Sequence, residues 1–192
     1  MAPAITVSAH VDGCESCRAR ISAFEHAEGR RMELSAPAPM SHDALECLLA
    51  RAADDPAAQS ATAPPSSEFL GDVRLPRAAA NTGFRRRRWL TAGLWAARMN
   101  GPRDAEWRTF LLRAPAGTRI PNHEHHGAEL IAVLSGSLRD SGTFGAGDFV
   151  ENDFHVHEMV VSQHGPCACL ISTQGPIKWR GWNRLIGVAL GV

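Results

Sequence analysis

The stretch GTRIPNHEHHGAELIAVLSG, residues 117–136, decides how the C-terminal half of the chain is organised. Its spacing is G-x5-H-x-H-x3-E-x6-G, which places His123, His125 and Glu129 in one short run. Residues two apart in a strand point to the same side, so we expect the two imidazoles to face one interior. The run AELIAVLSG that follows is typical of a buried strand and can bring the Glu129 carboxylate to the same interior. Such a ligand set suits zinc, manganese, iron, nickel or copper, so it predicts a metal site without choosing the ion.

This spacing resembles the first motif of the cupin family, and it matches that motif at every fixed position. The second cupin motif supplies a further histidine that faces the same metal. Here Gly147 and Asp148 begin that motif, and His157 lies within one residue of the usual spacing. His155 lies two residues earlier, on the same side of a strand, and is the competing candidate. The resemblance implies a divalent metal in the cupin site, with zinc favoured and manganese, iron or nickel as alternatives.

Composition and charge exclude several classes of protein. The chain has 192 residues, a formal net charge of zero and a pI near 7.1, so its overall charge does not predict nucleic-acid or membrane binding. The basic run at residues 85–88 is read as a solvated strand edge. The N-terminal sequence lacks the pattern of a secretory signal, and no apolar run approaches the roughly 20 residues that a membrane span needs. We therefore expect a cytoplasmic protein without direct nucleic-acid or membrane contact.

A second group of metal ligands is predicted near the N-terminus. Five cysteines in an apparently cytosolic chain favour metal binding or thiol chemistry over a disulfide framework. His10, Cys14 and Cys17 form the pattern H-x3-C-x2-C, and the sequence after Gly13 has helical periodicity. The partial positive charge at a helix start favours the thiolate that zinc binds. A closed zinc site needs four ligands, and the sequence shows three, so the predicted site is incomplete. A chance C-x-x-C at a helix start is the alternative.

This pattern resembles the zinc-binding anti-sigma domain, in which H-x3-C-x2-C opens a helix and a further histidine comes from an earlier helix. Nine residues precede His10 in this sequence, so we expect that earlier helix and its histidine to be missing.

The rest of the chain predicts a short helical part, a linker and a β domain. Leu45, Leu48 and Leu49 form one stripe of an amphipathic helix, and the Pro/Ala/Ser-rich sequence that follows reads as a linker. Many short strand-like runs with turn signals between them then predict an all-β barrel or sandwich. We expect a mainly β protein: a helical zinc-binding segment at residues 1–54, a linker at 55–80 and a cupin-type jelly-roll β-barrel at 81–192.

Cys167 and Cys169 lie two apart in a predicted strand, so their sulfurs face the same side. That spacing suits a metal or an incoming oxidant better than a mutual disulfide. The alternative is a pair of small buried residues, because free cysteine behaves as a small hydrophobe.

The order of these parts resembles the ChrR family of anti-sigma factors. The resemblance implies a helical domain that keeps an extracytoplasmic-function sigma factor from RNA polymerase, and a cupin domain that senses an oxidative or electrophile signal. It also implies that a second copy of the chain could pair with the first through the cupin domain. One rival interpretation is a metal-dependent cupin enzyme, a dioxygenase or an isomerase. Another is a small-molecule-binding cupin without a sigma partner. The implied metal ligands are His10, Cys14, Cys17, His123, His125, Glu129 and His157.

Overall fold

The computed structural model describes residues 2–54, 68–101, 106–125, 127–153 and 156–179. The chain forms two compact units, one made of Met1–Glu15 with Ser66–Val192 and the other of Ser16–Pro65. The first unit contains the strands and is described first. In the described part of the chain, no helix is both long enough and apolar enough to cross a membrane.

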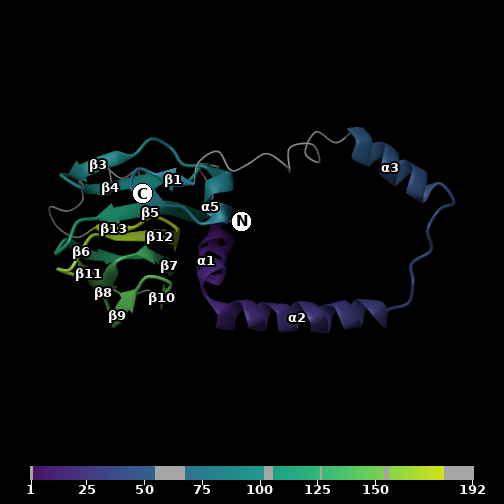
Figure 1. The fold of residues 1–192 in the computed structure, drawn as a ribbon, viewed down its shortest axis with the longest axis horizontal. Coiled ribbons are helices and arrows are strands. Elements are labelled where there is room, and N and C mark those ends of the chain that lie inside the picture. The colour runs from purple at the N-terminus through teal and green to yellow at the C-terminus, as the bar shows by residue number, and fades with distance from the viewer. Residues whose placement is uncertain (1, 55–67, 102–105, 126, 154–155, 180–192) are drawn as a thin grey trace. The chain divides into compact units, whose positions relative to one another are not determined.

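Two antiparallel sheets make up most of the first unit (Figure 1). The larger sheet runs β10 (Phe149–Asp153), β7 (Ala128–Ser135), β12 (Cys167–Gln174), β5 (Trp107–Ala114), β4 (Leu94–Arg98) and β3 (Arg88–Thr91). The smaller sheet runs β13 (Lys178–Trp179), β6 (Arg119–Glu124), β11 (His157–Val161), β8 (Ser137–Arg139) and β9 (Thr143–Gly145). The expected mainly β fold of jelly-roll type is confirmed, with two sheets rather than one closed barrel.

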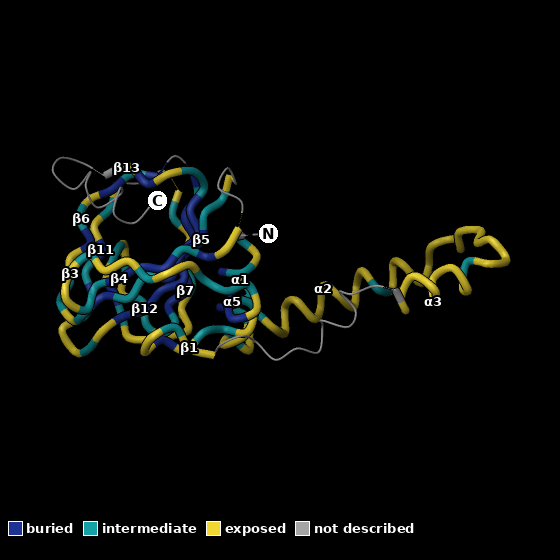
Figure 2. The backbone as a smooth tube through the Cα atoms, turned by 90° about the horizontal axis from the view of Figure 1, so that it is seen from above, coloured by how far each residue is buried: buried dark blue, intermediate teal, exposed yellow. Residues whose placement is uncertain are grey.

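The main core lies between the two sheets. Phe110, Ile131 and Ile171 of the larger sheet pack in one buried cluster with Ile120 and Met159 of the smaller one. In Figure 2 the buried residues are dark blue, and they are concentrated in strands such as β5, β7 and β12. Seven of the eight residues of β12 are buried, because one face of this strand meets the core and the other is also covered. The cover on that second face comes from helices and from the short segment around Val73.

Helix α1 (Ala2–Gly13) covers part of the outer face of the larger sheet. Ala9 packs in one cluster with Ala132 and Leu170, and the hydroxyl of Thr6 forms a 2.7 Å hydrogen bond with that of Ser172. The sequence predicts one helical segment at residues 1–54, whereas residues 1–15 belong to the unit of the strands. The sequence gives little sign of this helix, because its apolar residues form no strong amphipathic stripe.

The start of the β unit also differs from the expected linker at 55–80. Residues 55–67 lie outside the described part of the chain. Residues 69–82 form β1 (Phe69–Leu70), β2 (Val73–Arg74) and α5 (Arg77–Thr82). Val73, Ala79 and Ala80 are buried and anchor this segment, although a few small apolar residues give no readable periodicity in the sequence. The domain boundaries otherwise stay a prediction.

The second unit contains most of helix α2 (Glu15–Glu33) and helix α3 (Ala44–Asp54). Both lie where the sequence predicted helices. No residue of α2 is buried, and Phe24 is 68% exposed. The leucine stripe of α3 is exposed as well, with values of 60–64% for Leu45, Leu48 and Leu49. These helices bury little apolar surface in the chain itself.

Candidate metal centre

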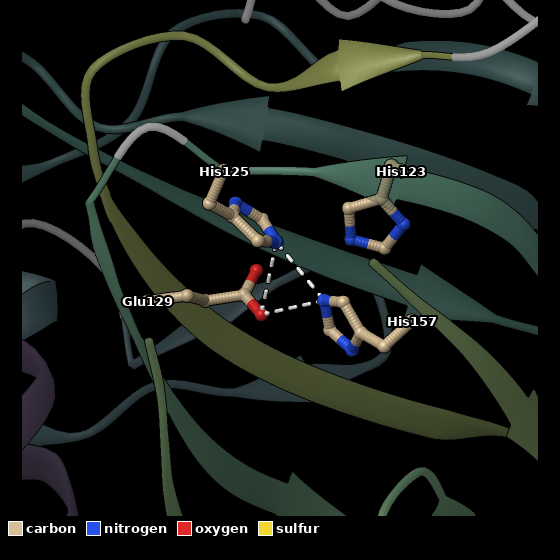
Figure 3. Close-up of side chains that lie close together, drawn as sticks. All are labelled: His123, His125, Glu129 and His157. Carbon is tan, nitrogen blue, oxygen red and sulfur yellow. Dashed lines mark hydrogen bonds and ion pairs between the residues drawn. The ribbon is translucent and has the colours of Figure 1, made fainter. Parts of the chain in front are cut away.

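Three strand segments bring the predicted cupin ligands together (Figure 3). His123 on β6 is the register partner of His157 on β11, and His125 follows the end of β6. Glu129 is the second residue of β7 and comes from the other sheet. One ligand atom from each of the four side chains lies within 4.8 Å of every other.

The close contacts converge on one small space. Nε2 of His125 lies 3.0 Å from Nε2 of His157. Oε2 of Glu129 lies 3.4 Å from the first of these nitrogens and 3.3 Å from the second. Two neutral imidazoles whose Nε2 lone pairs face each other repel, so this arrangement calls for a cation or a shared proton between them.

The burial of the candidate ligands and the hydrogen bonding of Glu129 indicate whether these residues suit a metal ion. His123, His125 and Glu129 are 1%, 3% and 1% exposed. Oε1 of Glu129 is buried without a hydrogen-bond partner. A buried carboxylate oxygen with no donor is costly, and a bound cation removes that cost. The donor set, nitrogen and carboxylate oxygen from four side chains, is one that divalent transition metals accept. The residues therefore fit a divalent metal.

The backbone orients one of the rings. Nδ1 of His123 lies 2.8 Å from the carbonyl oxygen of Pro121. A carbonyl oxygen only accepts, so Nδ1 carries the proton of this bond and Nε2 carries the lone pair. The neutral ring is the form that binds a metal.

The electrostatics of the site shift the pKa values of His123 and His157 in opposite directions. Burial lowers the pKa of His123 to about 4, although the Glu129 carboxylate acts in the opposite direction. Burial also lowers the pKa of His157, but the carboxylates of Asp140 and Glu129 outweigh it and raise that pKa to about 9. Burial raises the pKa of Glu129, and the histidines around it reverse the shift, so the carboxyl ionises below its usual range. In the absence of metal, the proton held by His157 supplies the positive charge of the cluster.

The N-terminal candidates also come together. His10 lies on α1, Cys14 follows that helix and Cys17 lies in the first turn of α2. One ligand atom of each lies within 4.8 Å of the others, and all three residues are partly exposed. The group supplies three ligands, one fewer than a closed zinc site needs.

Comparison with known proteins extends this picture to most of the chain. Residues 80–177 match the model of the ChrR Cupin-like domain. The chain is also 32% identical over 183 residues to the anti-sigma-E factor ChrR of Cereibacter sphaeroides, covering 93% of this chain and 83% of that protein. The chain belongs to the ChrR family.

The same relationship appears in a solved structure. The chain is similar to a chain in the crystal structure of Rhodobacter sphaeroides SigE in complex with the anti-sigma ChrR. The TM-score is 0.68 at 33% identity, and the match covers 88% of this chain and 87% of that one. Because it covers 88% of this chain, the match extends beyond the cupin-like domain at residues 80–177.

Of the two candidates for the fourth cupin ligand, His155 and His157, the structure describes only His157. His157 lies with the other ligands, whereas His155 falls outside the described residues. Glu158, which follows His157, points elsewhere and pairs with Arg119 at 2.9 Å. This agrees with the alternation expected for neighbours of strand ligands.

Two polar residues next to the candidate metal ligands were not predicted from the sequence. Asp140 follows the end of β8, and its Oδ2 lies 3.0 Å from Nδ1 of His157. Asn152 on β10 donates hydrogen bonds to Glu129 and Asp140. The motif spacing contains no signal for either residue, because both reach the site through strand pairing.

Cys167 and Cys169 lie side by side on β12, with their sulfurs 3.6 Å apart, and both are buried. They pack among the apolar residues of the main core. Neither belongs to the two groups of potential metal ligands found among the described residues. The packing is that of two small buried residues, while their reactivity stays a prediction.

Proposed function

We propose that this chain is an anti-sigma factor that holds an extracytoplasmic-function sigma factor and releases it when its cupin domain senses an oxidative or electrophile signal. The observation that carries the proposal is the similarity, over 88% of the chain, to a chain in the complex of SigE with the anti-sigma ChrR. The protein acts by binding a partner and does not convert a substrate. Because its partner works on RNA polymerase, we place it in the cytoplasm.

The exposed faces of α2 and α3 are the proposed surface for the sigma factor. Three leucines on one stripe of α3 and Phe24 on α2 are each at least 60% exposed. Apolar side chains at helical spacing favour burial in a partner's groove, because removing their surface from water contributes roughly 25 cal/mol per Å². Without a partner, these helices leave their apolar side chains exposed to water.

Metal ions are proposed to bind at two sites, one near the N-terminus and one in the cupin domain. His10, Cys14 and Cys17 bind zinc, for which thiolates are suitable ligands. A divalent metal binds in the cupin domain to His123, His125, Glu129 and His157. Zinc is favoured, and manganese, iron or nickel are the alternatives. A metal bound there supplies positive charge that neutralises the buried Glu129 carboxylate and stabilises the folded state.

Release follows from the chemistry of the ligands. Thiolates and imidazoles hold metal only when they are deprotonated and unmodified, so oxidation or alkylation weakens metal binding and removes the folding free energy that it supplied. A sigma factor that binds only the metal-stabilised state then dissociates, because its apparent affinity follows the population of that state.

A pull-down experiment with the cognate sigma factor tests this proposal. The untreated protein should retain the sigma factor, and treatment with peroxide, singlet oxygen or methylglyoxal should release it. Leu48→Glu should abolish retention because it places a charge in the apolar stripe of α3. Ala50→Glu adds the same charge to the exposed opposite side of that helix and serves as the matched control. If the Leu48→Glu variant retained the sigma factor as well as the control does, the proposed surface would be wrong.

A further inference from the structure

Asp140 is a buried carboxylate with well-defined neighbours. Its side chain is 5% exposed, and it lies at the end of β8, which pairs with the strand that carries His157. Oδ2 of Asp140 lies 3.0 Å from Nδ1 of His157 and accepts a hydrogen bond of 3.1 Å from Nδ2 of Asn152. The carboxylate therefore contacts the side of the imidazole that faces away from the other ligands.

Asn152 connects this carboxylate to a second one. It is the register partner of Glu129 across the pairing of β10 with β7. Its Nδ2 lies 3.3 Å from Oε2 of Glu129 as well as 3.1 Å from Asp140. An amide NH2 group has two hydrogens, and both carboxylates only accept, so one hydrogen is directed to each. The neutral amide thus separates two negative charges and holds both in place.

A carboxylate at Nδ1 has a defined effect on a metal-binding histidine. It keeps the proton on Nδ1 and fixes the plane of the ring, which leaves the Nε2 lone pair directed at the metal. Nε2 of His157 is the atom that meets His125 and Glu129. At His157 a carboxylate lies beside Nδ1 and the other candidate ligand atoms lie beside Nε2, which is the order of groups in a carboxylate–histidine–metal arrangement.

We propose that Asp140 and Asn152 are positioning residues of the cupin metal centre. Asp140 sets the proton position and orientation of His157, and Asn152 holds the carboxylates of Asp140 and Glu129 in their places. Neither residue ligates the metal. This inference rests on the metal centre in the proposed function and adds the residues that orient it.

The test measures zinc affinity by competition with a chromophoric chelator, using the full chain with Cys14→Ser so that only the cupin site is loaded. Asp140→Ala and Asn152→Ala should each bind zinc about 10–100-fold more weakly than the parent. Asp140→Asn keeps one oxygen acceptor and nearly the same volume, so its loss should be smaller. Asp72→Asn is the matched control, because it removes a carboxylate that pairs with Arg113 at 2.8 Å without contacting the ligands.

A second readout separates positioning from a general effect on the fold. In the cobalt-substituted protein, the visible d–d absorption should change in the Asp140 and Asn152 variants, because the His157 ring is no longer held. A structural role alone would lower the melting temperature of the metal-free protein but leave zinc affinity and the cobalt spectrum as in the parent. If Asp140→Ala does not fold, the Asp140→Asn variant makes the same comparison.

His123→Ala separates the failure of this inference from the failure of the metal centre. Loss of zinc in His123→Ala, together with parental affinity in Asp140→Ala and Asn152→Ala, would overturn the positioning role alone. Parental affinity in His123→Ala as well would overturn the metal centre on which the inference rests.

Discussion

Nδ1 of His10 lies 2.7 Å from the carbonyl oxygen of Gly147, and the same ring packs against Phe149 with centroids 5.5 Å apart. Gly147 begins the second cupin motif, and β10 leads from Phe149 to Asn152, which donates a hydrogen bond to Glu129. His10 also belongs to the N-terminal group of potential metal ligands. With Nδ1 donating to the carbonyl, Nε2 is the nitrogen left for a metal. One residue thus contacts the cupin sheet and also belongs to the group for which zinc binding is proposed.

We predict that His10→Ala destabilises the metal-free β unit. The substitution removes the hydrogen bond to Gly147 and the packing on Phe149, which should lower the free energy of unfolding by about 0.5–1.5 kcal/mol. Urea unfolding followed by tryptophan fluorescence measures this, because the four tryptophans in the described part of the chain lie in the unit of the strands. His26→Ala on the exposed face of α2 is the control and should leave the unfolding midpoint unchanged. An unchanged midpoint in His10→Ala too would mean that the contact contributes nothing.

A buried chain of hydroxyl groups should also hold α1 on the sheet. The Ser172 hydroxyl lies 2.7 Å from that of Thr6 and 2.7 Å from that of Thr109, and all three residues are buried. Ser172→Ala removes one hydrogen-bond partner from each of two buried hydroxyls and should lower the free energy of unfolding by about 1–3 kcal/mol. A double-mutant cycle with Thr6→Val should show that the two effects are not additive. Full additivity would contradict a direct interaction between α1 and β12.

Metal binding should release a proton from His157 near neutral pH. Its pKa of about 9 means that the ring is protonated in the metal-free protein, and a metal can bind Nε2 only after the ring has lost a proton. Apparent metal affinity should therefore rise with pH up to about 9. The charged ring stabilises the metal-free fold fully below the unfolded pKa of about 6.5, and this contribution is lost as the pH rises through 9.

Calorimetry in buffers of different ionisation enthalpy counts this proton. The protein should carry Cys14→Ser and Cys17→Ser, so that thiol protons do not contribute. A His157→Gln variant should bind metal more weakly and release about one proton fewer. Equal proton release from the two proteins would show that His157 is neutral before binding.

The group of candidate metal ligands could be predicted from the sequence because the cupin motif encodes it by short-range spacing. His123 lies on β6, His125 is the first residue after that strand, and Glu129 is the second residue of the next strand, β7. The jelly-roll followed from the same motif and from the alternation of short strands with turn signals. These features are local, so a single sequence shows them.

The features that the sequence did not predict depend on pairing between distant segments. Asn152 reaches Glu129 only through the register of β10 with β7, and Asp140 reaches His157 from the end of another strand. Helix α1 contains several β-branched residues and no strong apolar stripe, and its docking on the sheet stabilises it despite weak local signals. No local pattern determines any of these three arrangements.

The most direct test of the account is the metal content of the purified protein, measured by elemental analysis beside Cys14→Ser and His123→Ala variants. The account predicts one ion at the cupin ligands and one at the N-terminal group, with His123→Ala losing only the first and Cys14→Ser only the second. A His123→Ala variant that keeps the full metal content of the parent would contradict the claim that His123, His125, Glu129 and His157 hold a metal.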